Sequence, residues 1–103
     1  MKLYYVYVLA SISGVLYIGM TGNLEQRLIA HRWSTDLRRF TTRYRVWKLV
    51  YTEEYTEVVQ AIERETQLKG WRREKKLALI RAVNPGLTDL APYLYPGRVA
   101  RPG

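Results

Sequence analysis

The order of the elements in this sequence predicts a small α/β (α+β) domain in which helices flank a three-stranded sheet. Two segments rich in tyrosine and valine stand near the start of the chain, and a third alternating segment follows farther on. Three other segments have apolar residues at helical spacing. The resulting order, β-β-α-β-α-α, predicts a small mixed or antiparallel sheet flanked by helices.

The first two predicted strands form a hairpin. Residues 2–10 and 15–21 are rich in Tyr, Val, Leu and Ile, and "SISG" (Ser11 to Gly14) between them is a turn signal. Residues 45–52, "RVWKLVYT", alternate well enough to predict the third strand.

The three predicted helices have recognisable ends. Asn23 is a favourable N-cap for "LEQRLIAHRW", with Gln26 at capping-box spacing. Thr56 is the expected N-cap of "EVVQAIERETQLK", which should end near Gly70. The last helix, "WRREKKLALIRAV", should stop at "NPG", residues 84–86.

Size and composition limit the possible functions. The 103 residues predict one domain over residues 1–92 and a flexible tail over 93–103, which contains two prolines and two glycines. The chain has no cysteine, which excludes a disulfide, a thiolate zinc site and a cysteine nucleophile and fits a cytoplasmic protein. We expect no membrane span, because no apolar run of about eighteen residues is present.

The charge of the chain favours a polyanionic partner, with nucleic acid first. Seventeen Lys and Arg against nine Asp and Glu give a formal net charge of +8. No phosphate-cradling glycine loop is present, and no small-molecule cofactor is expected.

Two tyrosines of the predicted hairpin could meet. If residues 11–13 form the loop, Tyr7 lies directly opposite Tyr17, whereas a four-residue loop would send the two hydroxyls to opposite faces. Gly19, beside Tyr17, leaves bare backbone that a bulky group could approach closely. Ordinary cross-strand packing would explain either tyrosine by itself.

Three further polar residues lie on predicted helix faces. Arg27 and His31 are four residues apart, along the edge of an apolar stripe. Glu65 falls near the middle of the stripe of the second helix, which contains Val58, Ala61, Ile62 and Leu68. A carboxylate there requires either a metal or an ion pair, for instance with Arg27 or Arg73, and the pattern leaves both open.

The basic residues cluster in two places. One cluster surrounds the predicted third strand and comprises Arg38, Arg39, Arg43, Arg45 and Lys48. The other surrounds Trp71 and comprises Lys69, Arg72, Arg73, Lys75 and Lys76. Such clusters bind phosphates, although a solvated helix face is the simpler explanation, and Trp71 fits a core residue better than a base-stacking platform. The expected nucleic-acid contacts are Arg43, Lys69, Arg72, Arg73 and Lys76.

Taken together, these residues resemble the GIY-YIG nuclease superfamily, and most of all its short single-domain bacterial members. The similarity lies in "YVY" (Tyr5 to Tyr7), in "YIG" (Tyr17 to Gly19) ten residues after Tyr7, and in Arg27, His31 and "RETQLKGWRREKKLALI". It covers about residues 3 to 92. Two departures are Tyr-Val-Tyr in place of Gly-Ile-Tyr, and "NPGLTDL", which lacks the tryptophan often found before Asp-Leu.

The resemblance implies divalent-metal-dependent hydrolysis of DNA phosphodiester bonds at Tyr7, Tyr17, Arg27, His31 and Glu65. Glu65 would hold Mg²⁺ (or Mn²⁺), and Arg27 would contact a non-bridging phosphate oxygen. Tyr17, helped by Tyr7, is the first choice to deprotonate the attacking water, and His31 would orient or deprotonate one of the tyrosines. Because a tyrosine hydroxyl has a reference pKa of about 10, this role requires nearby positive charge.

The resemblance leaves the substrate open. The chain has no room for a separate recognition domain, so we expect low or structure-dependent specificity, with RNA not excluded as a substrate. Thr21 and Asn23 are weaker candidates for phosphate contact. Two alternatives stay open: a non-catalytic basic nucleic-acid-binding module with the same fold, and a protein-interaction domain with a tyrosine surface.

Overall fold

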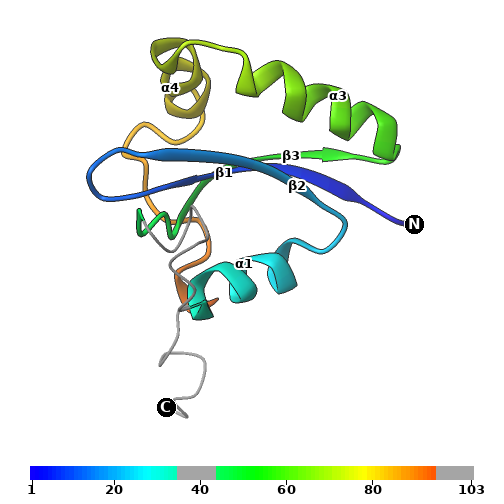
Figure 1. Cartoon of the computed structure of the whole chain (residues 1–103), viewed down its shortest axis with the longest axis horizontal. Helices are drawn as coiled ribbons and strands as arrows, with labels where there is room; N and C mark the ends of the chain where they lie inside the picture. The colour runs from blue at the N-terminus through cyan, green and yellow to red at the C-terminus, as the bar shows by residue number, and fades with distance from the viewer. Residues whose placement is uncertain (35–43, 95–103) are drawn as a thin grey trace.

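A computed structural model describes residues 1–34 and 44–94 of the chain (Figure 1). Its elements are β1 (Tyr4–Ala10), β2 (Leu16–Thr21), α1 (Leu24–Trp33), β3 (Lys48–Tyr55), α3 (Val58–Lys69), α4 (Arg73–Arg81) and the 3₁₀ turn η1 (Pro92–Leu94). This order confirms the predicted class and the order β-β-α-β-α-α. Within the described residues, no helix has the length and apolar character needed to cross a membrane.

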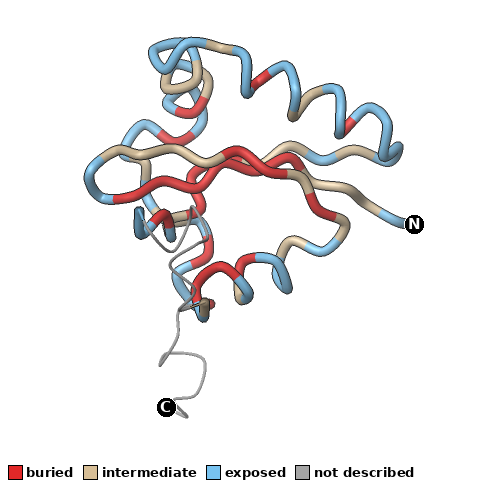
Figure 2. Tube along the Cα trace, viewed as in Figure 1, coloured by how far each residue is buried: buried red, intermediate tan, exposed pale blue. Residues whose placement is uncertain are grey.

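The sheet has the strand order β2-β1-β3, and both strand pairs are antiparallel. Helices α3 and α4 lie over one face and α1 lies over the other (Figure 1). The buried residues follow the central strand and the helix faces turned toward it (Figure 2). The cluster on the α3 face includes Val6, Val8, Ile18, Ala61, Leu68 and Ile80, and that on the α1 face includes Tyr7, Leu9, Leu28, Val46, Leu49 and Leu94.

The register of the β1–β2 hairpin differs from the predicted one. Tyr7 pairs with Gly19 and Leu9 pairs with Tyr17, so the two tyrosines are diagonal neighbours and do not lie directly opposite each other. The shift is two residues, which preserves the side-chain alternation. Tyr7 and Tyr17 therefore still project from the same face of the sheet.

A wider turn explains this register. The last hairpin pair is Ala10 with Leu16, and residues 11–15 form the loop. The Ser11 amide donates to the Val15 carbonyl at 2.9 Å, and the Val15 amide donates to Ser11 Oγ at 2.9 Å. Gly14 completes the turn at a φ of +96°, a conformation that glycine adopts without strain.

The helix and strand ends confirm some predictions and correct others. Asn23 caps α1, because its side chain accepts a hydrogen bond from the Gln26 amide at 3.1 Å. Gly70 ends α3 as predicted, but the N-cap of α3 is Glu57 and not Thr56. Helix α4 is shorter than predicted at both ends.

Strand β3 begins at Lys48 and ends at Tyr55, three residues later than predicted at each end. The predicted start falls on Arg45, which has a φ of 54° and so cannot continue a strand. Val46, just after it, is fully buried on the α1 face before the strand begins.

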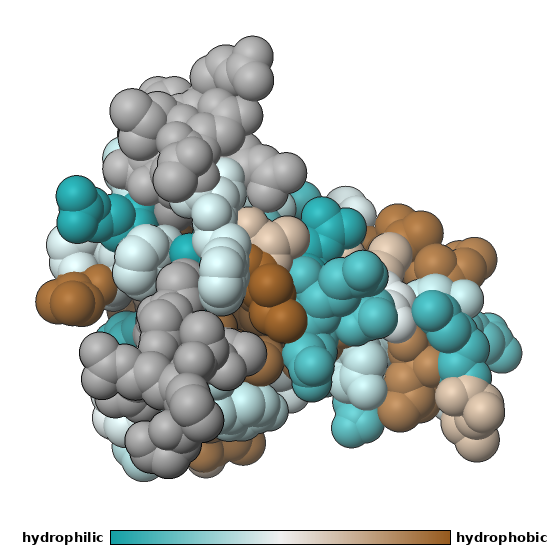
Figure 3. Space-filling model, turned by 90° about the horizontal axis from the view of Figure 1, so that it is seen from below, coloured by the Kyte–Doolittle hydropathy of each residue, from teal (hydrophilic) through white to brown (hydrophobic). Residues whose placement is uncertain are grey.

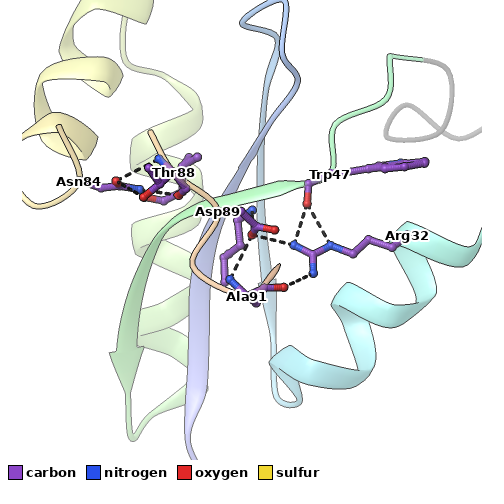
Figure 4. Close-up of polar contacts among 8 residues, drawn as sticks. Arg32, Trp47, Asn84, Thr88, Asp89 and Ala91 are labelled. Atoms are coloured by element: carbon purple, nitrogen blue, oxygen red, sulfur yellow. Dashed lines mark hydrogen bonds and ion pairs between the residues drawn. The ribbon is translucent and has the colours of Figure 1, made fainter. Parts of the chain in front are cut away.

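The segment after α4 returns to the sheet and is held there by polar side chains (Figure 4). The Asn84 amide donates to the carbonyls of Val50, at 3.0 Å, and Thr88, at 2.9 Å. Leu94 is buried, so the folded part extends at least to this residue and beyond the predicted boundary at 92. Residues 95–103 of the predicted tail lie outside the described residues.

A buried ion pair joins this segment to α1 (Figure 4). The Arg32 guanidinium donates to Asp89 Oδ1 at 2.9 Å, to the Ala91 carbonyl at 2.6 Å and to the Trp47 carbonyl at 3.1 and 2.9 Å. Asp89 Oδ1 also accepts from the amides of Leu49 and Ala91, each at 3.1 Å. These bonds fix α1 relative to the start of β3.

Candidate active site

Tyr7 is the buried centre of the candidate site. Its side chain projects from the middle of β1 toward α1, and its hydroxyl lies 3.1 Å from Nε2 of His31. The Tyr7 ring covers the backbone of Gly19, where an added Cβ would lie 2.5 Å from the hydroxyl oxygen. The bulky group that approaches this bare backbone is therefore Tyr7 itself.

Tyr7, Tyr17 and His31 form one group of rings, which we call the aromatic cluster. The ring centroids are 6.3 Å apart for Tyr7 and Tyr17, 6.2 Å for Tyr7 and His31, and 5.5 Å for Tyr17 and His31, which meet edge to face. Tyr7 and His31 are buried, whereas Tyr17 is half-buried on the edge strand β2. Tyr17 is thus the more accessible of the two hydroxyls.

Burial raises the pKa of Tyr7 far above its ordinary value. The Tyr17 hydroxyl raises the Tyr7 pKa further, Arg27 opposes this rise, and the Glu65 carboxylate reinforces it. The Tyr7 hydroxyl therefore keeps its proton at neutral pH and takes part in the hydrogen bond with His31 Nε2 as a neutral group. Because Arg27 and Glu65 both affect the Tyr7 pKa, their charges lie within electrostatic reach of the Tyr7 hydroxyl.

Arg27 is exposed on α1 and lines a hollow of about 320 Å³ at the start of that helix. Thr21 and Asn23 line the same hollow, but their polar groups are largely occupied. Thr21 Oγ1 accepts from the Asn23 amide at 3.1 Å, and the Asn23 side chain caps the helix. Arg27 is the cation among the residues that line this hollow.

Glu65 lies at the edge of the buried face of α3 and not at its middle. Ala61 and Leu68 are the buried residues of α3, whereas Val58 and Ile62 of the predicted stripe are exposed. The Glu65 side chain is 21% exposed, and its Oε2 is 3.1 Å from Lys69 Nζ. Of the two alternatives left open for Glu65, a metal or an ion pair, the structure contains an ion pair, and its partner is Lys69, one helical turn away, rather than Arg27 or Arg73.

The surroundings of Glu65 fit a hydrated metal ion better than an all-protein cage. Mg²⁺ is commonly bound through one or two carboxylates and several waters, and an accessible carboxylate at a helix edge meets that requirement. In residues 1–34 and 44–94, no group of three or more His, Asp or Glu side chains is placed to share an ion.

The basic cluster around Trp71 is only partly available for ligands. Lys75 Nζ lies 4.1 Å from the centroid of the Trp71 ring, and Arg64 Cζ lies 5.1 Å from it. Trp71 also packs against the buried cluster on the α3 face, in agreement with a core residue. Of the expected nucleic-acid contacts, Arg72 and Arg73 are exposed and Lys76 is half-buried. Lys69 pairs with Glu65, and Arg43, like Arg38 and Arg39, lies outside the described residues.

Sequence reasoning missed two polar groups that hold the site in place. One is the ion pair of Arg32 with Asp89. The sequence feature that could have indicated it is the position of Arg32 on α1, next to the site residue His31. The other is Glu53 on β3, which accepts hydrogen bonds from Arg64 Nε at 2.9 Å and Nη2 at 3.0 Å. The alternation of β3 gave no sign of this contact with α3.

Comparisons with known proteins show the family to which the chain belongs. Residues 3–78 match the model of the GIY-YIG catalytic domain. A UPF0213 protein of Staphylococcus saprophyticus is 34% identical over 80 residues, which cover 78% of this chain and 96% of the relative. A UPF0213 protein of Syntrophus aciditrophicus is 36% identical over 77 residues, which cover 75% of this chain and 88% of the relative.

A solved structure has the same fold. The solution NMR structure of a UPF0213 protein from Bacillus halodurans is similar with a TM-score of 0.54 and 25% identity, covering 82% of this chain and 88% of that one. The GIY-YIG catalytic domain implies nuclease activity and a nucleic-acid substrate. From the matched domain, the relatives and the shared fold, the chain belongs to the GIY-YIG family of nuclease domains.

Proposed function

We propose that this protein is an endonuclease that hydrolyses DNA phosphodiester bonds with a divalent cation, Mg²⁺ or Mn²⁺, held by Glu65. The observation that supports this most directly is the environment of one hydroxyl. Tyr7 lies 3.1 Å from His31 Nε2, and its pKa, raised chiefly by burial, also responds to Tyr17, Arg27 and Glu65. The buried Tyr7 hydroxyl thus interacts with all four of the other proposed site residues, with His31 by a hydrogen bond and with the other three electrostatically.

The two tyrosines have different roles in this proposal. Tyr7 is buried and protonated, and its hydrogen bond with His31 Nε2 holds the imidazole in place. Tyr17 is accessible and lies edge-on to the same imidazole, so it is the group that takes a proton from the attacking water. To accept this proton, the Tyr17 hydroxyl must first have given up its own.

Arg27 contacts the phosphate. Its guanidinium is exposed beside a hollow at the first turn of α1, where a non-bridging phosphate oxygen can approach it. The arginine would stabilise the charge that builds up on the phosphate oxygens in the transition state. When bound at Glu65, a divalent cation supplies Lewis-acid stabilisation of the phosphate and of the leaving oxygen.

We expect low sequence specificity or specificity for DNA structure. Seen from the side of α1, the part of the surface that is not grey shows hydrophilic side chains next to separate apolar groups (Figure 3). Together with the net charge of +8, such a surface suits contacts with the phosphate backbone, which is the same in every sequence.

The test is cleavage of supercoiled, single-stranded and branched DNA with Mg²⁺ or Mn²⁺. Glu65→Gln and Arg27→Ala should each lower the cleavage rate by roughly 100-fold or more, the effect typical of removing one stabilising group from a transition state. Glu63→Gln and Arg81→Ala are matched controls, because both residues are exposed and lie outside the site. Cleavage at the wild-type rate in both site variants would refute the assignment.

The second candidate is a non-catalytic nucleic-acid-binding module. It is favoured by the ion pair of Glu65 with Lys69, because a lysine ammonium at 3.1 Å competes with a metal for the carboxylate. Binding of DNA by the wild type without cleavage in either metal would select this function.

A further inference from the structure

A second pocket lies at the end of the sheet, beyond the aromatic cluster. We call it the tip pocket: it has a volume of about 520 Å³ and lies between the turn of the β1–β2 hairpin and the segment that leads into β3. Its lining includes Ala10, which follows Leu9, the partner of Tyr17. The tip pocket therefore begins one residue pair farther along β1 than Tyr17.

The tip pocket exposes aromatic and apolar side chains. Ile12 is 96% exposed, Tyr44 is 44% exposed and Trp47 is 37% exposed, and all three line the pocket. Figure 4 shows the Trp47 indole extending away from Asp89 and Ala91, while the Trp47 carbonyl turns toward Arg32. Exposed apolar groups gathered at a concave site indicate a ligand.

Both walls of the tip pocket are held by hydrogen bonds. On one side, Arg32 donates twice to the Trp47 carbonyl, at 3.1 and 2.9 Å. On the other side, Ser11 Oγ bonds Ser13 Oγ and accepts from the Val15 amide, each at 2.9 Å. A backbone held in this way does not have to be ordered when a ligand binds, which lowers the entropic cost of binding.

The backbone of Arg45 adds a second sign of a built site. Its φ of 54° lies in the left-handed region, which is unfavourable for a residue with a side chain. Strain of this kind persists where the surrounding structure imposes it, often at binding sites. Here the strained residue is also one of the two cations among the described lining residues.

The charges of the tip pocket select an anionic ligand. Arg45 and Lys48 line it, and none of its described lining residues is acidic. An aromatic surface flanked by cations is the combination that stacks an unpaired base and neutralises the adjoining phosphate. Paired bases inside a duplex do not offer their faces for stacking.

We propose that the tip pocket binds an unpaired nucleobase of the substrate, with Trp47 and Tyr44 contacting the base and Arg45 and Lys48 contacting the phosphate beside it. This inference rests on the proposed function in that it takes a nucleic acid as the ligand. It adds a substrate class: DNA with a single-stranded segment next to the bond that is cut.

The experiment compares the affinities of a short oligothymidylate and of a duplex of the same length, in EDTA so that no cleavage occurs. Trp47→Ala should weaken oligothymidylate binding by roughly 10- to 100-fold, the range typical of one lost base-stacking contact, and should leave duplex binding nearly unchanged. Trp47→Phe keeps an aromatic ring and should stay close to wild type. Trp33→Ala is the matched control, because Trp33 is 53% exposed and is not among the lining residues.

Several results would overturn the inference. These are unchanged oligothymidylate affinity in Trp47→Ala, equal losses for single strand and duplex, or the same loss in Trp33→Ala. A change from dimer to monomer in Trp47→Ala, with unchanged affinity, would assign the pocket to a second copy of the chain. Thermal unfolding checks that Trp47→Ala is folded, which we expect because the two hydrogen bonds from Arg32 go to the carbonyl of residue 47, which the substitution keeps.

The two proposals fail in different ways. Cleavage that depends on Glu65 but not on the tip pocket would refute this inference alone. Selective binding of single strands through Trp47, without cleavage in any metal, would support the tip pocket and refute the endonuclease. A wild-type protein that binds no nucleic acid would refute both.

Discussion

At position 19 the chain has no side chain, and the Tyr7 ring occupies the space where one would be. An added Cβ would lie 2.5 Å from the Tyr7 hydroxyl oxygen and 2.6 Å from Cζ. The glycine therefore sets the tilt of the ring, and the tilt sets the 3.1 Å distance from Tyr7 to His31. A residue without functional groups thus controls a contact at the site.

We expect Gly19→Ala to displace the Tyr7 ring. Overpacking in a buried site typically lowers the free energy of unfolding by about 1–3 kcal/mol, and the bond to His31 should be lost as well. Urea unfolding measures the first effect and the cleavage rate measures the second. Gly86→Ala is the control, since its Cβ would meet only a Thr88 side-chain carbon at 3.5 Å. A Gly19→Ala protein with wild-type stability and activity would contradict this account.

At the scale of elements, one carboxylate joins α3 to the sheet. Glu53 on β3 accepts hydrogen bonds from Arg64 on α3, at 2.9 and 3.0 Å, and from the hydroxyls of Tyr51, at 2.5 Å, and Tyr55, at 2.7 Å. Arg64 immediately precedes Glu65. We infer that this group, which we call the Glu53 cluster, fixes the rotation of α3 and with it the direction of Glu65.

The Glu53 cluster should make the stability of the protein depend on pH. Burial by itself would raise the pKa of Glu53, but hydrogen bonds from Arg64, Tyr51 and Tyr55 outweigh it and lower the pKa. A lowered carboxyl pKa gives stability that is present above the unfolded value of about 4.3 and is lost as the pH falls below it. Burial raises the pKa of Tyr51 to about 12, so stability should also fall as the pH rises through that value.

We therefore expect Glu53→Gln to reduce the free energy of unfolding at neutral pH by about 1–2 kcal/mol, allowing for partial solvent screening. The variant should also lose stability less steeply than wild type between about pH 5 and pH 3. Urea unfolding across this range is the measurement, and Glu54→Gln, an exposed neighbour, is the control. If Glu53→Gln lost stability as steeply as wild type at acid pH, another carboxylate would be the cause of that loss.

At the scale of the whole molecule, the cations that give the net charge of +8 differ in their roles. Arg32 and Arg64 hold the fold together, and Lys69 pairs with Glu65. Other cations, such as Arg72 and Arg73 at the start of α4, are exposed. Binding to duplex DNA should therefore depend on the exposed cations rather than on the total charge.

We expect the logarithm of the DNA association constant to fall linearly with the logarithm of the salt concentration. Arg72→Ala should weaken binding to all duplex sequences alike and reduce this slope by about one, as expected for one lost phosphate contact. Arg81→Ala, at the other end of α4, should leave the slope unchanged. Titrations in EDTA measure both, and equal slopes for wild type and Arg72→Ala would exclude Arg72 from the interface.

The sequence predicted the local features of this protein well. The element order, the Asn23 cap and the end of α3 at Gly70 depend on residues close together in the chain, and all were confirmed. The shared face of Tyr7 and Tyr17 follows from strand alternation, which tolerates a shift of two residues. The GIY-YIG family was predictable for a similar reason, because its motifs are short and regularly spaced.

Only the tertiary structure decided the contacts between distant segments. The hairpin register depended on the hydrogen bonds between Ser11 and Val15, and the surroundings of Glu65 depended on how α3 rotates against the sheet. The pairing of Arg32 with Asp89 joins residues 57 positions apart. Propensity and periodicity report the preferences of a segment for its own conformation, whereas these contacts depend on which buried faces meet, and no single segment contains that information.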